Sequence, residues 1–125
     1  MKELTKAEEQ VMKVLWELEK AFVKDIIEHL PLPKPAYNTV STIVRILEKK
    51  DFVGHHAYGK THQYYPLVTK AEYSSFSLKK LLGGYFGGSF EELVSFFARE
   101  QDMDIAEVEQ LVKHAVKQID SKKDE

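Results

Sequence analysis

The 125-residue chain contains no cysteine, which excludes disulfide bonds, thiolate metal sites and cysteine nucleophiles. It also has no stretch near the roughly 20 apolar residues that a membrane-spanning helix needs. The acidic residues Glu3, Glu8 and Glu9 stand where a secretory signal requires a cationic start and an apolar segment. Apolar residues nevertheless make up 43% of the chain, which is enough to form a core. We therefore expect a soluble, cytoplasmic protein without membrane insertion.

Basic residues do not dominate the composition, since 18 Lys and Arg side chains face 20 Asp and Glu side chains for a net charge of −2. The charges are nevertheless distributed unevenly. Residues 34–70 carry six basic side chains, two acidic side chains and three histidines, whereas residues 71–125 carry seven basic and eleven acidic ones. A basic middle segment favours contact with a polyanion, and the acidic C-terminal segment indicates a different role.

Three helices are predicted in the first half of the chain. Thr5 followed by Glu8 is a capping-box pattern. It opens a helix whose apolar residues recur at spacings of three and four, namely Leu4, Ala7, Val11, Val14, Leu15 and Leu18. The second helix carries Val23, Ile26, Ile27 and Leu30, and must end by Pro31 because proline removes a backbone donor. The third covers about residues 38–50, with a buried side formed by Val40, Ile43, Val44 and Leu47.

Two segments that follow, FVGHHAY and THQYYPL, are rich in aromatic and β-branched residues and are separated by Gly59 and Lys60. This pattern predicts a β-hairpin. Three helices followed by a hairpin is the order of elements in a winged helix-turn-helix, whose third helix enters the major groove of DNA while the hairpin lies against the neighbouring backbone. The sequence therefore predicts a DNA-binding domain over residues 1–70.

The outward side of the third helix carries side chains that hydrogen-bond base edges and phosphates. The candidate DNA-binding residues are Asn38, Thr39, Ser41, Thr42, Arg45 and Lys49 on this helix and His56, Lys60 and Tyr64 in the hairpin. DNA binding is favoured by the positive charge of residues 34–70 and by the absence of acids between Leu30 and Leu47. The alternative is a winged-helix module that meets another protein through its third helix, without sequence-specific DNA binding.

The histidines of the hairpin raise the separate question of a metal site. His55 and His56 are adjacent on a predicted strand, so that they point to opposite faces. Zinc requires three or four ligands that converge on one point, and no thiolate or nearby carboxylate completes such a set. We expect these residues to contact the DNA backbone or solvent, and we predict no metal and no cofactor.

Residues 71–125 are predicted to be helical. Leu78, Leu81, Leu82 and Tyr85 form an apolar stripe, which the pairs Gly83-Gly84 and Gly87-Gly88 are expected to interrupt because glycine costs about 1 kcal/mol inside a helix. Two further helices begin at capping patterns, Ser89 with Glu92 and Asp104 with Glu107. No arrangement of residues indicates an enzyme, since the glycine-rich stretch lacks the lysine and the preceding strand of a P-loop.

Three short helices cannot bury all the large apolar side chains of residues 71–125 among themselves, and small helical units with such side chains usually oligomerise. Residues 71–125 are therefore predicted to form a helical dimerisation domain. The candidate dimerisation residues are Leu81, Leu82, Phe90, Leu93, Val94, Phe97, Val108, Leu111 and Val112. The predicted fold class is mainly α with a small β-hairpin, a winged helix-turn-helix domain followed by a helical dimerisation region.

Several motifs together resemble the penicillinase-repressor family of the BlaI and MecI type. They are Ala7-Glu8-x-x-Val11-Met12-x-x-Leu15-Trp16, Thr39-Val40-x-Thr42-Ile43, Leu47-x-Lys49-Lys50 and Gln63-Tyr64-Tyr65-x-Leu67-Val68. Members of that family commonly have glycine at the position of Asp51, and members such as MecI carry arginine at that of Ile46. The resemblance implies a homodimeric transcriptional repressor that binds a pseudo-palindromic, double-stranded DNA operator.

The resemblance also implies a mode of release. In the resembling repressors, induction involves proteolytic cutting at an Asn–Phe bond in the first C-terminal helix, which destroys the dimer and frees the operator. Alignment on Phe90 and Leu93 places that bond at Lys80–Leu81 in this chain. A membrane-bound sensor protease is the partner that this mode of release implies.

Overall fold

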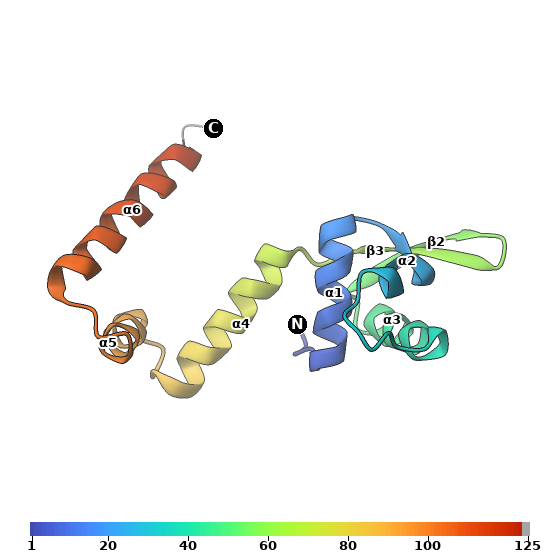
Figure 1. The fold of residues 1–125 in the computed structure, drawn as a ribbon, viewed down its shortest axis with the longest axis horizontal. Helices are drawn as coiled ribbons and strands as arrows, with labels where there is room; N and C mark the ends of the chain where they lie inside the picture. The colour runs from blue at the N-terminus through green and yellow to red at the C-terminus, as the bar shows by residue number, and fades with distance from the viewer. Residues whose placement is uncertain (124–125) are drawn as a thin grey trace. The chain divides into compact units, whose positions relative to one another are not determined.

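The computed structural model describes residues 1–123 and divides into two compact units. The first unit spans Met1–Leu78, and the second begins at Lys79. Helices α1 to α3 and a small sheet lie in the first unit, α4 begins there and continues into the second, and α5 and α6 follow (Figure 1). The division falls eight residues beyond the boundary predicted from sequence, because Tyr73 and Phe76 pack against the core of the first unit. The assignment of DNA binding and dimerisation to the two parts stays a prediction.

Helices α1 (Lys6–Leu18), α2 (Val23–Glu28) and α3 (Tyr37–Lys49) confirm the three helices predicted in the first half of the chain. The predicted capping box at the start of α1 is also confirmed. The backbone N–H of Glu8 donates to Oγ1 of Thr5 at 3.2 Å, and the backbone N–H of Thr5 donates to Oε1 of Glu8 at 2.8 Å. Two orphan donors of the first helical turn are thereby satisfied.

The predicted hairpin is formed by β2 (Val53–Tyr58) and β3 (Thr61–Pro66). Gly59 has a φ of 65° at the first position of its two-residue turn, the position that requires glycine in a type II′ turn. A short strand that was not predicted, β1 (Ala21–Phe22), pairs with β3 and gives an antiparallel sheet of order β1-β3-β2. Two residues are too few to show the alternation by which strands are recognised in a sequence.

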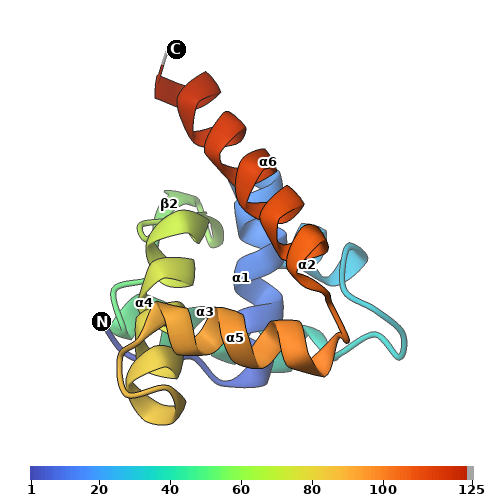
Figure 2. The ribbon, with the colours of Figure 1, turned by 90° about the vertical axis from the view of Figure 1, so that its left-hand side faces the viewer.

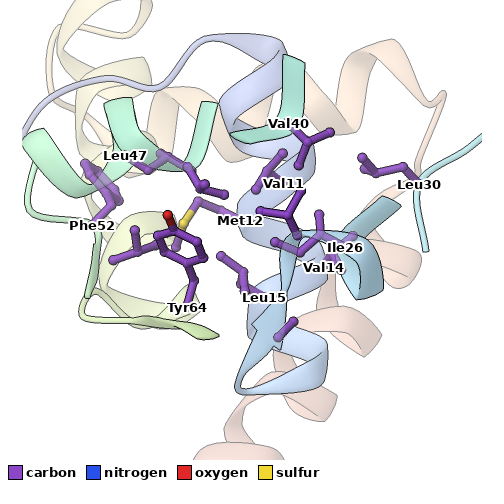
Figure 3. Packing of buried hydrophobic residues seen from close by; sticks show 14 of the residues in the cluster. Val11, Met12, Val14, Leu15, Ile26, Leu30, Val40, Leu47, Phe52 and Tyr64 are labelled. Atoms are coloured by element: carbon purple, nitrogen blue, oxygen red, sulfur yellow. The ribbon is translucent and has the colours of Figure 1, made fainter. Parts of the chain in front are cut away.

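The core of the first unit lies between the three helices and the sheet (Figure 3). Met12 and Leu15 of α1, Ile26 of α2 and Val40 and Leu47 of α3 all have 0% exposed surface. Four residues of the predicted apolar stripes are less buried than the others, because Ala7 is exposed and Leu18, Ile27 and Ile43 are only partly buried.

The second half of α4 (Lys70–Tyr85) contradicts the predicted interruption at Gly83-Gly84, because the helix continues through both residues. The two glycines therefore weaken this helix without ending it. The chain leaves the helix at Gly87 and Gly88, whose φ angles are 58° and 81°. There the N–H of Gly88 donates back to the carbonyl of Leu82 at 2.8 Å.

Helices α5 (Phe90–Glu100) and α6 (Ile105–Lys123) complete the described chain. Both predicted helix starts are confirmed. Oγ of Ser89 accepts from the N–H of Glu92 at 3.1 Å, and Oδ1 of Asp104 accepts from the N–H of Glu107 at 2.9 Å. Figure 2 shows α5 and α6 joined by a short connection and running in different directions. None of the helices in residues 1–123 has the length and apolar content required to span a membrane.

An ion pair fastens α1 to the end of α3. Nζ of Lys50 lies 2.7 Å and 2.9 Å from the two carboxylate oxygens of Glu8, whose side chain is only 5% exposed. Burial opposes the charged form of Glu8, but the hydrogen bonds from Lys50 and Thr5 outweigh it and lower the pKa of this carboxyl group. The ion pair therefore stabilises the fold above the unfolded-state pKa, and the stabilisation is lost as pH falls through the lower folded-state pKa.

Replacing Glu8 by glutamine should lower the free energy of unfolding by about 2 kcal/mol at neutral pH, because Lys50 loses its charged partner. Urea titrations at a fixed protein concentration measure this difference. The difference in unfolding free energy between wild type and Glu8→Gln should narrow as pH falls through the lowered pKa of Glu8, since Glu8 then becomes neutral in the wild type as well. The control is Glu9→Gln, which alters the exposed pair with Lys13. A gap that stays constant down to strong acid would contradict this account.

Candidate nucleic-acid interface

The outward face of α3 is the polar surface that the burial of its other side leaves exposed. Val40, Val44 and Leu47 have no exposed surface, and this fixes the rotation of the helix about its axis. The residues that consequently face outward, all of them predicted as DNA-binding candidates, are Asn38, Thr39, Thr42, Arg45 and Lys49. The structure brings these five candidates together on one side of one helix.

The prediction that Ser41 faces outward is wrong, because only 8% of this residue is exposed. It follows Val40 and precedes Val44, so it lies at the flank of the buried stripe, where a small side chain fits. Its hydroxyl is used within the protein: Nη2 of Arg45 donates to Oγ of Ser41 at 3.0 Å. Ser41 therefore supports the guanidinium group of Arg45 from the side.

Two exposed residues of α3 were missed by the sequence analysis. Tyr37 at its first position is 56% exposed, and Ile46 is 40% exposed. Ile46 falls one residue before Leu47, where the helical period already turns toward solvent. Its signal was present in the sequence as an apolar residue outside the buried stripe. Both side chains add apolar surface to the outward face of α3, and such surface suits contact with a thymine methyl group.

The first turn of α3 offers backbone donors to a phosphate. The N-cap residue Ala36 has no side chain that can bond these groups, and no acidic residue lies in the first turn. The N–H groups of Thr39 and Val40 point to the carbonyl of Ala36, which leaves those of Tyr37 and Asn38 without an intrahelical acceptor. An uncapped helix start of this kind attracts anions.

The hairpin presents two of its three predicted contacts to solvent, since His56 and Lys60 are exposed. His56 stacks on the ring of Tyr65, with centroids 4.9 Å apart. Tyr64 requires a correction, because it belongs to the core and is 4% exposed (Figure 3). Burial raises the pKa of Tyr64, and the nearby charge of Glu48 raises it further. Alternation along the strand predicts that one of two adjacent tyrosines is buried, but it does not say which.

His55 makes a contact that was not predicted from the sequence, in which no carboxylate lies close to the histidines. Its Nδ1 lies within hydrogen-bonding distance of Oε2 of Glu48 on α3, and its ring stacks on His62 with centroids 4.1 Å apart. Residues seven apart in sequence meet here because β2 turns back along α3. Among the described residues, no group of three or more histidine or carboxylate side chains could hold a metal ion.

Two ion pairs, Glu8 with Lys50 and Glu48 with His55, determine which charges of α3 and the hairpin are available to a ligand. Lys50 is bound to Glu8 on the inner side of α3, so it is not a free cation for a ligand. Glu48 lies against His55, so its negative charge is compensated when the imidazole is protonated. Arg45, Lys49 and Lys60 remain as exposed cations, and the carboxylate of Asp51 is also exposed. The combined surface of α3 and the hairpin is therefore positive.

The second unit carries the other set of predicted site residues. Many large apolar side chains are exposed there, among them Leu81, Phe90, Val94, Phe97, Leu111 and Val112, whereas Leu82, Leu93 and Val108 are partly buried. A groove of about 380 Å³ between α5 and α6 is lined by Phe90, Leu93, Val94, Phe97, Ala98, Met103, Val108, Leu111, Val112 and Ala115. All of these lining residues are apolar. Lys80 and Leu81, the predicted cleavage position, lie within α4, and Leu81 is 42% exposed.

Comparison with known proteins agrees with this architecture. A family model described as penicillinase repressor matches residues 4–117. The chain is 30% identical over 110 residues to the methicillin resistance regulatory protein MecI of Staphylococcus aureus (strain N315), a match that covers 87% of this chain and 89% of that protein. It is 24% identical over 110 residues to the penicillinase repressor of Bacillus licheniformis, covering 87% and 86% of the two chains.

The first unit also resembles a solved structure, that of the DNA-binding domain of the repressor BlaI. The TM-score is 0.50 at 28% sequence identity, and the match covers 58% of this chain and 94% of that one. The winged-helix fold predicted from the order of elements is therefore confirmed. With a family model that spans nearly the whole chain and a DNA-binding domain of the same fold, this protein belongs to the penicillinase repressor family of transcriptional repressors, which are not enzymes.

Proposed function

We propose that this repressor binds a pseudo-palindromic operator as a homodimer in the cytoplasm, with α3 in the major groove and the hairpin against the backbone. The observation that carries the proposal is the outward face of α3, where polar and cationic side chains stand beside an exposed wing in a DNA-binding fold. Helix-turn-helix proteins place such a helix in the groove, and symmetric dimers read two half-sites.

Each side chain of the interface has a role that its chemistry suggests. Arg45 and Asn38 can form paired hydrogen bonds with guanine and adenine edges, respectively. Thr39, Thr42 and Lys49 bind base edges or phosphates, although the hydroxyl of Thr42 already donates to the carbonyl of Asn38 at 2.9 Å. His56 and Lys60 on the wing meet the phosphate backbone. The uncapped start of α3 adds two backbone donors for a phosphate.

Footprinting on the region upstream of the protein's own operon tests the proposal most directly. A protected site with two related half-sites about one helical turn apart supports it. Affinity should also fall steeply as salt increases, because phosphate contacts release counterions. A protein that uses α3 to bind another protein would leave the DNA unprotected and show no such dependence.

The variants Arg45→Ala and Lys60→Ala should separate base recognition from phosphate binding. We expect Arg45→Ala to weaken binding to the protected site by about 1–3 kcal/mol, with little effect on random duplex. Lys60→Ala should weaken binding to both DNAs alike and reduce the slope of log affinity against log salt by about 1. Titrations monitored by fluorescence anisotropy measure both quantities. The charge-matched control is Arg99→Ala on α5, and equal affinities for Arg45→Ala and wild type would remove Arg45 from the interface.

The apolar surface of the second unit supports dimerisation through a second copy of the chain. Phe90, Phe97 and Leu111 are each more than half exposed in one protomer, although they line a common groove between α5 and α6. Several exposed apolar side chains that line one groove are typical of a surface that contacts another protein. Dimerisation would bury the groove and would also hold two DNA-binding units together, so that binding of the second half-site becomes intramolecular.

The full-length chain should sediment as a dimer at micromolar concentration. Phe97→Glu should shift it toward monomer, because dimerisation would bury a carboxylate in the apolar groove without a partner for its charge. Operator affinity should fall when the dimer is lost, since binding of the second half-site is then no longer intramolecular. The control Glu100→Gln changes charge on the same helix outside the groove. Analytical ultracentrifugation of the three proteins gives the result, and a wild-type monomer at this concentration would contradict the proposal.

We also propose release by proteolysis within α4, with a membrane-bound sensor protease as the partner. The Asn–Phe pair of the resembling repressors is replaced by Lys80–Leu81, so the protease would need a different specificity. Gly83 and Gly84 lower the stability of the same helix and favour its local opening. Separation of the two units at this point would leave each DNA-binding unit alone on its half-site.

Limited proteolysis with a nonspecific protease should cut first between Lys79 and Gly88, because the helix that carries Gly83 and Gly84 opens most easily there. Mass mapping of the early fragments locates the cut, and titration of the cleaved protein should show that operator affinity is lost. In the variant with alanine at both Gly83 and Gly84, the same cut should slow severalfold, since alanine favours the helix by about 1 kcal/mol per residue. First cleavage in the hairpin, or tight binding by the cut protein, would exclude this mechanism.

A further inference from the structure

The contact between Glu48 and His55 joins the DNA-reading helix to the wing. Nδ1 of His55 on β2 meets Oε2 of Glu48 on α3, and the two side chains are 31% and 35% exposed. Behind His55, the ring of His62 on β3 stacks in parallel, with centroids 4.1 Å apart and planes 7° apart. The contacts therefore run from α3 through β2 to β3, and they include both strands of the wing.

The position of Glu48 is unusual for a DNA-binding surface. A carboxylate close to the phosphates opposes binding, because it repels them. The other groups that face His55 are His62 and Tyr64 from β3, and the charge of Arg45 on α3 acts in turn on Tyr64. Glu48 is the one carboxylate in this group, so a negative charge is placed where electrostatics alone disfavours it.

The structure of the wing suggests a role for the carboxylate of Glu48. Its base is fixed by Phe52 and Val53, which are 1% exposed, whereas residues 56–61 are all exposed. Between the base and the exposed end, Glu48 and His55 form a polar contact between the wing and α3. A wing that is held in place loses less conformational entropy when it binds DNA.

We infer that Glu48 and His55 are positioning residues, which hold the wing at the angle that lets α3 and the wing contact one DNA duplex together. The inference rests on the proposed function and deepens it. Neither side chain needs to touch DNA. The hydrogen bond between the carboxylate of Glu48 and the imidazole of His55 resists movement of β2 away from α3.

The direction in which Glu48→Gln changes DNA affinity distinguishes a positioning role of Glu48 from simple repulsion of phosphates. Removing a carboxylate from a DNA-facing surface should strengthen binding if Glu48 only repels phosphate. If Glu48 holds the wing, Glu48→Gln should weaken binding even though the protein becomes more positive. The matched control is Asp51→Asn, which removes the same charge three residues away. Asp51 has a φ of 64°, a conformation that asparagine adopts readily.

The experiment uses full-length protein and a duplex that the wild type has selected from a random-sequence pool. We expect Glu48→Gln to bind it about fivefold more weakly than wild type, the size of effect typical of a partly exposed polar contact. Asp51→Asn should bind as tightly as wild type or more tightly.

His55→Gln breaks the same contact from the wing and should cause a similar loss of affinity. Because both residues act through one contact, the double variant should bind no more weakly than either single variant. Additive losses, or a Glu48→Gln protein that binds as tightly as wild type, would overturn the positioning role alone. A wild-type protein that selects no duplex from the pool would overturn the proposed function and this inference together.

Discussion

The burial of one side of α3 is the constraint on which the functional surface depends. Val40, Val44 and Leu47 are completely buried, and a helix with a 3.6-residue period can then present only one set of side chains to solvent. Helix α1 contributes to the same constraint. Its Met12 and Leu15 are buried in the shared core, and its Glu8 forms an ion pair with Lys50. An ion pair at the end of α3 and apolar contacts along it therefore determine together which residues face outward.

Periodicity was sufficient to predict most of this arrangement from the sequence. The capping pair Thr5 and Glu8, the apolar spacing of α1 and α3 and the glycine turn of the hairpin are local signals, and the structure confirms them. Predictions were wrong where a residue lies at the margin of a pattern. Ser41 flanks the buried stripe and is small enough to be covered, and the alternation of a strand could not decide between Tyr64 and Tyr65.

Other features could not be predicted because they depend on the packing of separate elements. The pairing of β1 with β3 requires the hairpin to be in place first, and its two residues carry no pattern of their own. The carboxylate of Glu48 meets His55 only because β2 returns beside α3. Likewise, the apolar content of residues 71–125 predicts that a partner is needed, but the geometry of the groove between α5 and α6 follows from their loop and caps.

The two polar contacts of α3 therefore have different consequences for the protein. Glu8 and Lys50 lie on the inner side, where the carboxylate is 5% exposed, so breaking their contact leaves a charge poorly solvated and affects the stability of the whole unit. Glu48 and His55 lie at the margin, where each is about one-third exposed and water can replace a lost partner. The outer contact can be broken without unfolding the domain, because its energy is small compared with that of the core. A contact of this strength is suited to positioning the wing, whereas the inner contact is suited to holding α3 in place.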